Sequence, residues 1–234
     1  MIAVSPLLAL MGLIGTVGLP PASAHDPPRD NMRLVAESAE VRLSGDSNLW
    51  RWSCSASALQ AFLEIDLDDE TWHETVRAIL EDRPHPPHLP QPVIRARFAI
   101  AALECGSARM ERDLRDATRA ADHPEVIYAL THVDQTWRGP EEENGTAVYG
   151  AETVGSLTLA GRTRPTQHDA YVRIHDDGNT FEVEGVLALN MKDFGIEPPV
   201  ALLGLLRARE DIQVWYRLVA HGPDEPAPST SLPE

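Results

Sequence analysis

Apolar and polar side chains alternate along much of this chain with a period of two residues, and this pattern restricts the fold more than any other feature. The clearest stretch places one set of side chains on each face of a strand: Phe181, Val183, Leu187, Leu189 and Met191 against Glu182, Glu184 and Asn190. Residues 50–54, 94–100, 126–130 and 212–218 repeat the pattern. Antiparallel strands with one dry face and one wet face produce such alternation. We therefore expect an all-β domain.

Turn and helix signals separate these strands. The segment Asp176-Asp177-Gly178-Asn179 favours positive φ angles and predicts a tight hairpin, and Gly45-Asp46 predicts a second turn. Apolar residues at helical spacing predict one helix over about 108–121, capped by Ser107, and another over about 69–80. We expect the second helix to lie across the β-domain as a lid or plug.

The two ends of the chain differ from its strand-forming middle. Residues 1–24 contain an apolar run and then an A-x-A ending, which predicts a signal peptide cleaved after Ala24. An uncleaved anchor is the alternative, but about 13 apolar residues fall short of the roughly 20 that a membrane-spanning helix needs. The segments 25–33 and 222–234 are rich in Pro, Ser and acidic residues, and we expect them to be disordered. The mature protein is then one domain, 34–221, periplasmic or secreted and not integral to a membrane.

The chain has two cysteines, Cys54 and Cys105. Exported proteins mature in an oxidising compartment, where an even number of cysteines favours disulfide formation. We therefore predict a Cys54–Cys105 disulfide, which closes a loop of about 50 residues and contributes roughly 4 kcal/mol to stability. Two separate buried thiols are the alternative.

Charge and motifs argue against several classes of function. Acidic residues outnumber Lys and Arg by 36 to 20, and the net charge of -16 repels nucleic acids and anionic membrane surfaces. His25, His85 and His88 are candidate metal ligands. His85 and His88 lie in a proline-rich loop with no Cys or carboxylate at the spacing of a structural zinc site, so we predict no bound metal. The chain contains no G-x-S-x-G, H-E-x-x-H or G-x-x-x-x-G-K-[ST] motif, and we predict that it is not an enzyme.

Two longer segments carry a resemblance to a known family. Residues 155–165, GSLTLAGRTRP, resemble the L-T-[IL]-x-G-x-T-[RK]-P-V signature of the YceI-like family, with Thr166 in place of the final Val. Residues 191–207, MKDFGIEPPVALLGLLR, are similar to the M-x-D-F-G-I-x-P-P-x-A-L-L-G-L-L segment of a subgroup of that family. Shorter segments near Cys54 and Cys105 also match this subgroup, and all the matching segments have the same order in both sequences. The resemblance therefore covers roughly residues 34–220.

The resemblance implies an extended eight-stranded antiparallel barrel, similar to lipocalins, with one or two short helices. It also implies that the protein binds a lipid-like polyisoprenoid or quinone-type chain in the lumen and carries or stores it in the cell envelope, with no other cofactor. Residues 45–51 replace a Phe-x-x-x-His pattern common in relatives, and the segment Asp69 to Pro92 is longer than its counterpart. A barrel filled by side chains, which acts through protein partners in the envelope, is the alternative. Homodimer formation stays open.

Apolar residues on the inward faces of the expected strands are the candidates for contact with the ligand. They are Trp52, Phe62, Phe98, Ile127, Leu157, Leu159, Phe181, Val183, Leu187, Phe194 and Val214. Ordinary core packing is the alternative explanation for each of them. Arg162 and Arg164 are candidates for an anionic head group, because guanidinium groups match oxyanion geometry. Solvated turn charges are the alternative for these two arginines.

Overall fold

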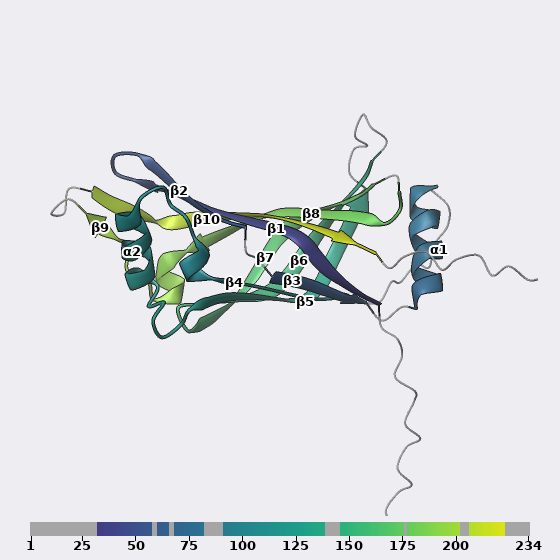
Figure 1. The fold of residues 1–234 in the computed structure, drawn as a ribbon, viewed down its shortest axis with the longest axis horizontal. Coiled ribbons are helices and arrows are strands. Elements are labelled where there is room, and N and C mark those ends of the chain that lie inside the picture. Colours follow the sequence, from purple (N-terminus) through teal and green to yellow (C-terminus); the bar gives the residue numbers. More distant parts are fainter. Residues whose placement is uncertain are drawn as a thin grey trace, which may run out of the picture.

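Strands dominate the structure, a computed structural model that describes residues 32–57, 60–65, 68–81, 91–138, 146–175, 177–201 and 206–222 (Figure 1). The strands are β1 (Met32–Ser47), β2 (Arg51–Ala56), β3 (Gln60–Ile65), β4 (Val93–Ala99), β5 (Glu125–Arg138), β6 (Ala147–Leu159), β7 (Arg162–Ile174), β8 (Thr180–Asn190), β9 (Val200–Ala201) and β10 (Leu206–His221). The helices are α1 (Asp69–Leu80) and α2 (Ala108–Ala117), and the 3-10 turns are η1 (Ile100–Ala102) and η2 (Met191–Phe194).

Several predictions concern parts of the chain outside these residues. The signal peptide, most of the N-terminal segment 25–33 and nearly all of the C-terminal segment 222–234 lie there, and so do His25, His85 and His88. The domain boundaries therefore stay predictions. None of the helices in the described residues is long and apolar enough to cross a membrane.

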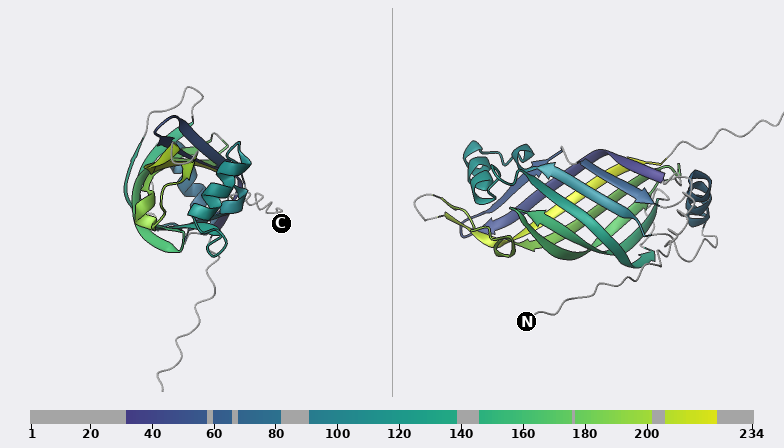
Figure 2. Two further views of the ribbon diagram at one scale, coloured as in Figure 1. Left: turned by 90° about the vertical axis from the view of Figure 1, so that its left-hand side faces the viewer. Right: turned by 90° about the horizontal axis from the view of Figure 1, so that it is seen from below.

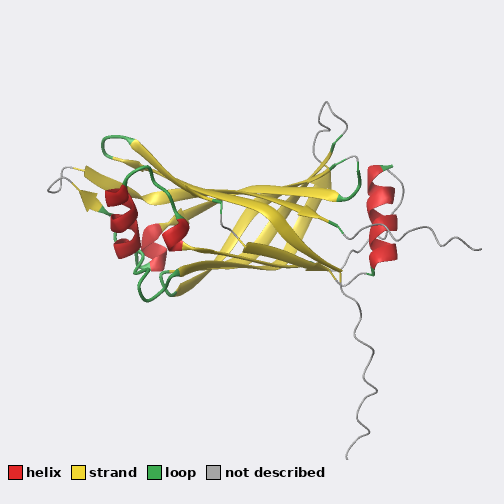
Figure 3. Cartoon of the chain, viewed as in Figure 1, coloured by secondary structure: helices red, strands yellow, loops and turns green. Residues whose placement is uncertain are grey.

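The strands form a barrel in which every neighbouring pair is antiparallel. The order around the ring is β1, β3, β4, β5, β6, β7, β8 and β10, and pairing of β1 with β10 completes it. β2 lies on the same side of β1 as β3, and β9 pairs with the start of β10. Within the described residues the ring thus has eight members, and the predicted all-β fold is confirmed (Figure 3).

The predicted hairpin at 176–179 joins β7 to β8. His175 donates its backbone N–H to the Thr180 carbonyl at 3.0 Å, and Gly178 has a φ angle of 65°. The carboxylate of Asp177 accepts hydrogen bonds from the backbone N–H groups of Asn179 and Thr180 at 2.9 and 2.8 Å. An acidic residue followed by glycine is the combination that this tight reversal needs.

The prediction that Gly45-Asp46 forms a turn is wrong. Both residues lie within β1, and the chain reverses slightly later, where Ser47 donates its backbone N–H to the Trp50 carbonyl at 2.9 Å. Gly45 pairs across the hairpin with Trp52, and a Cβ atom at this position would lie 2.6 Å from the indole ring. The glycine therefore provides space for a tryptophan and does not turn the chain.

Helix α2 covers one end of the barrel (Figure 2). The side chain of Ser107 caps it, as predicted, and accepts a hydrogen bond from the Met110 backbone N–H. The helix ends at Ala117 and not near residue 121, since Arg119 adopts a positive φ angle of 54°. The predicted disulfide joins Cys54 in β2 to Cys105, three residues before the helix begins, so it ties the barrel wall to the cover.

Helix α1 covers the opposite end (Figures 1 and 2). Its bounds agree with the prediction, and the Asp68 carboxylate caps it by accepting from the Thr71 backbone N–H at 2.9 Å. Trp72 and Val76 pack against Phe181 and the end of β7, with the Trp72 and Phe181 ring centroids 5.1 Å apart. This helix is a lid over the barrel end, held there by apolar contacts.

Candidate ligand-binding lumen

The barrel encloses a cavity of about 190 Å³ with almost entirely apolar walls. Alternate residues of β8 line it from Phe181 to Leu189, a distance of about 27 Å along the strand. Leu114 and Thr118 line it at the end that α2 covers. The space is therefore long and narrow, and its shape fits a linear apolar chain better than a compact molecule.

Most residues predicted for the lumen do line this cavity. They are Trp52, Phe98, Leu157, Leu159, Phe181, Val183, Leu187 and Val214. The side chain of Phe62 lies outside the described part of the structure. Phe194, the last residue of η2, is only 2% exposed, but it packs in the core and does not line the cavity.

The prediction that Ile127 lines the lumen is wrong. Its side chain is 40% exposed, whereas the neighbouring residues Val126 and Tyr128 line the cavity. Successive side chains of a strand point to opposite faces, so these two neighbours leave Ile127 on the outside.

Arg162 and Arg164 also lie outside the lumen. Both are exposed at the start of β7. Arg164 donates from Nε to the Asp193 carbonyl at 2.8 Å, and the Arg162 guanidinium occupies the space that a Cβ at Gly195 would need. Their observed contacts hold the η2 turn and do not support a head-group site in the lumen.

A group of polar residues lies in the middle of the cavity wall, and the sequence did not predict it as a site. It consists of Tyr128, Thr153, His168 and Tyr216, called the polar cluster below. His168 of β7 contacts the hydroxyl of Tyr216 through Nε2 at 2.9 Å. The Tyr128 and Tyr216 rings meet the His168 ring edge-on, with centroids 6.0 and 5.7 Å away.

Two glycines allow the tyrosines to converge on His168. Gly185 of β8 pairs directly with Tyr216 of β10, and a Cβ at this position would collide with the phenol ring. On the other side, a Cβ at Gly155 of β6 would lie 2.7 Å from the Tyr128 hydroxyl. Each tyrosine thus reaches over a glycine on an intervening strand toward the same histidine on β7.

Hydrogen bonding assigns the proton of His168. Thr153 donates its hydroxyl hydrogen to the His168 carbonyl at 2.7 Å and faces Nδ1 at 3.2 Å, so Nδ1–H is the donor to Thr153. Nε2 then accepts from the Tyr216 hydroxyl. Burial lowers the pKa of His168, an effect that Asp169 partly offsets. Burial also raises the pKa values of Tyr128 and Tyr216, so the cluster is uncharged at neutral pH.

Sequence signals for this cluster exist, but they are weak. Tyr128 and Tyr216 belong to the apolar faces that the period-two alternation identified, and an aromatic residue on such a face is normally interpreted as part of the core. His168 lies at inward spacing with Ala170, which would have marked it as a polar residue in a dry face. The convergence of three strands on one histidine has no counterpart in linear sequence.

Comparison with known proteins agrees with this architecture. The family model of the YceI-like domain matches residues 63–220. The chain belongs to this family. Among solved structures, this chain is similar to BcnA of Burkholderia cenocepacia. The TM-score is 0.52, and the identity is 13% over 77% of this chain and 95% of that one. The chain is also similar to a polyisoprenoid-binding domain of Saccharophagus degradans implicated in plant cell wall breakdown, with a TM-score of 0.54 and 9% identity over 82% and 98% of the two chains. No curated protein matches the sequence.

A second pocket of about 300 Å³ lies beside α2 at one end of the YceI-like barrel. Trp52, Leu114, Met191 and Pro199 line both this pocket and the lumen. Its outer wall includes Arg109 and the half-exposed Trp50. The pocket and the lumen therefore adjoin each other along this shared wall.

The described residues contain no cluster of three or more His, Cys, Asp or Glu side chains able to hold a metal ion. The polar groups in the lumen are uncharged hydroxyls and an imidazole. The site is therefore suited to the burial of an apolar molecule with a small polar group.

Proposed function

We propose that this protein binds a lipid-like isoprenoid chain in the barrel lumen and carries or stores it in the cell envelope. The observation that carries the proposal is the long, apolar cavity that extends along β8 and reaches Leu114 of α2 at one end of the barrel. In other proteins, an engineered apolar cavity of similar size stays dry and accepts an apolar guest.

The energetics of burial support a chain-like ligand. Each buried CH₂ group contributes about 0.8 kcal/mol, so several isoprene units offset the ordering of the ligand without a charged contact. The cavity remains open after the side chains of the wall are packed, which favours binding over a barrel filled by its own side chains.

Family membership and similar structures support the same class of ligand. The Saccharophagus degradans domain is described as polyisoprenoid-binding, and its barrel covers most of this chain. At 9% identity the likeness concerns the fold, and the proposal rests on the cavity of this chain. Binding, and not catalysis, is the activity that this family and this lumen favour.

An envelope location is part of the proposal. The sequence of residues 1–24 predicts export, and the Cys54–Cys105 disulfide is typical of proteins that fold in an oxidising compartment. Mass spectrometry of the protein purified from its host would test the location, since export predicts a mature chain that begins at His25.

Native mass spectrometry followed by solvent extraction tests the binding proposal. We expect the purified protein to carry an isoprenoid, and we expect Leu187→Trp, which fills the lumen, to abolish its retention. Val186→Trp is the matched control, since Val186 is the next residue along β8 and is 48% exposed. A wild-type protein that stays empty after incubation with prenyl lipids would contradict the proposal.

A further inference from the structure

The polar cluster is unusual because it places hydrogen-bonding groups in the middle of a dry lumen. Ordinary core packing would place apolar side chains at these inward positions. Here two glycines, Gly155 and Gly185, instead leave space for the phenol rings of two tyrosines. Polar groups in apolar surroundings are costly unless they find partners. The arrangement therefore points to a polar ligand group at this depth.

The hydrogen-bond inventory shows what the cluster can offer. Thr153 uses its single hydrogen on the His168 carbonyl, and His168 Nε2 accepts from Tyr216. The oxygen of Tyr216 keeps acceptor capacity toward the lumen. The Tyr128 hydroxyl interacts with Thr153, and it can rotate its hydrogen toward a ligand atom instead. One donor and one acceptor thus flank the same stretch of cavity.

Charge decides which polar group fits between them. None of the described residues that line the lumen is a lysine or an arginine, and the cluster itself is uncharged. A phosphate or diphosphate would lose its hydration here without a compensating cation. An uncharged oxygen loses much less and gains the tyrosine contacts.

We propose that Tyr128 and Tyr216, positioned on either side of His168, bind an uncharged hydroxyl group of the isoprenoid ligand, which accepts from Tyr128 and donates to Tyr216. This inference rests on the proposed function and adds the chemical class of its ligand. The apolar chain lies along the rest of the lumen, and the cluster sets how deep the oxygenated group is held.

Four probes with one farnesyl chain test the inference: farnesylacetone, farnesol, farnesene and farnesyl diphosphate. We expect the wild-type protein to bind farnesol about three- to tenfold more tightly than the hydrocarbon farnesene, as quenching of tryptophan fluorescence would measure. The double variant Tyr128→Phe/Tyr216→Phe should lose this preference and keep its affinity for farnesene. Tighter binding of farnesylacetone than of farnesol would contradict the assignment of a hydroxyl, because a ketone cannot donate to Tyr216.

Controls separate the site from the fold. Tyr171→Phe changes a tyrosine that is 40% exposed on the outer face of β7, and it should preserve the preference. If the double variant keeps the preference, or farnesene binds as tightly as the oxygenated probes, the inference is wrong while the proposed function stands. Tightest binding of the diphosphate would also overturn it, and would place the head group in the outer pocket near Arg109. If no probe binds the wild-type protein, farnesene included, the proposed function itself fails.

Discussion

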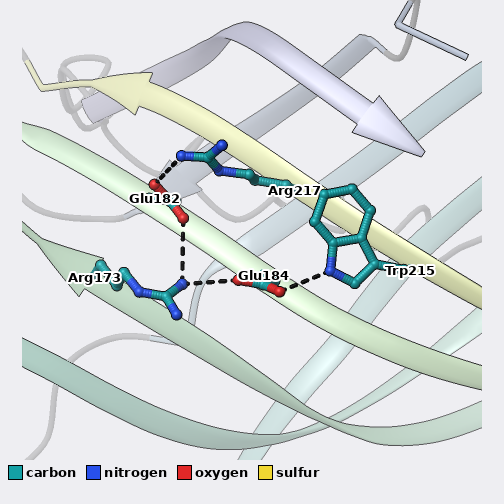
Figure 4. Close-up of polar contacts among 5 residues, drawn as sticks. All are labelled: Arg173, Glu182, Glu184, Trp215 and Arg217. Carbon is teal, nitrogen blue, oxygen red and sulfur yellow. Dashed lines mark hydrogen bonds and ion pairs between the residues drawn. The ribbon is translucent and has the colours of Figure 1, made fainter. Parts of the chain in front are cut away.

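The wall of the barrel carries a polar network on each of its faces, and the two differ in chemistry although they share strands. On the lumen face, Tyr216 of β10 bonds to His168 through uncharged groups. On the outer face, the next residue in each direction along β10 makes a bond to a carboxylate: Trp215 donates to Glu184 and Arg217 to Glu182, each at 2.7 Å (Figure 4).

Four of the five residues in the outer network carry a full charge, and Trp215 is the exception. Arg173 of β7 bridges Glu182 and Glu184 at 3.3 and 3.0 Å. The hydrogen bond from Trp215, together with Arg173, lowers the pKa of Glu184. Glu182 is only 7% exposed, and its carboxylate contacts both Arg173 and Arg217, which are the partners that a buried charge needs.

The comparison shows that the two faces of one strand, and not the identity of the strand, differ in chemistry. Alternate residues of a strand meet either the apolar cavity or the outer surface of the barrel, so the lumen side carries only uncharged groups, whereas ion pairs form on the outer side. Four predictions test this contrast, beginning with the largest effect.

Placing a charge on the wrong face should have the largest effect. Leu187 is 6% exposed in the lumen, and Leu187→Lys would bury an unpaired ammonium group. We expect a loss of about 3–5 kcal/mol in the free energy of unfolding, or failure to fold. On the outer face, Val186→Lys should change stability by less than about 0.5 kcal/mol. Urea unfolding of both variants decides the matter, and equal losses would remove the contrast between the faces.

Filling the space above a glycine should have the next largest effect. Gly185→Ala pushes a methyl group into the Tyr216 ring, and we expect it to cost about 1–3 kcal/mol. The same substitution in a Tyr216→Ala background should cost clearly less, because the clash is gone. A double-mutant cycle measures this coupling. Additive losses would show that Gly185 serves another purpose.

Removing the central carboxylate of the outer network should have a smaller effect. Glu182→Gln takes a charged partner from Arg173 and Arg217, and we expect a loss of about 1 kcal/mol that shrinks in high salt. Glu210→Gln is the control, because the exposed pair of Glu210 with Lys192 should contribute very little. Thermal unfolding at low and high salt compares the two, and a salt-independent loss would argue against a charge effect.

The pH dependence of stability should show the smallest difference. Burial lowers the pKa of His168 in the folded protein, so below about pH 6.5 the unfolded chain binds a proton that the native state does not. His168 therefore reduces stability as the pH falls through this range. We expect His168→Gln to lose less stability than wild type between pH 7.5 and 5.5. Urea unfolding at the two pH values measures the difference, and identical slopes for the variant and the wild type would contradict the prediction.

Much of the fold was predictable because local patterns encode it. Alternation identified the inward faces of β8 and β10, and the side chains of Asp68 and Ser107 occupy the helix starts that were expected. Even the error at Ile127 can be traced to the same rule, since the face predicted from Val126 and Tyr128 already excluded it. Half-buried strands reveal themselves in this way because one face must be dry.

What the sequence by itself determined is therefore local: strand faces, caps, the β7–β8 hairpin, and a cysteine pair with one possible intramolecular bridge. Only the tertiary structure decided that Tyr128, His168 and Tyr216 meet, because they come from β5, β7 and β10 and are brought together by closure of the barrel. It also showed that Gly155 and Gly185 make room for phenols and that Arg162 and Arg164 hold a turn. A period of two specifies which way a side chain points, whereas its partners across the lumen depend on the pairing register of every strand between them.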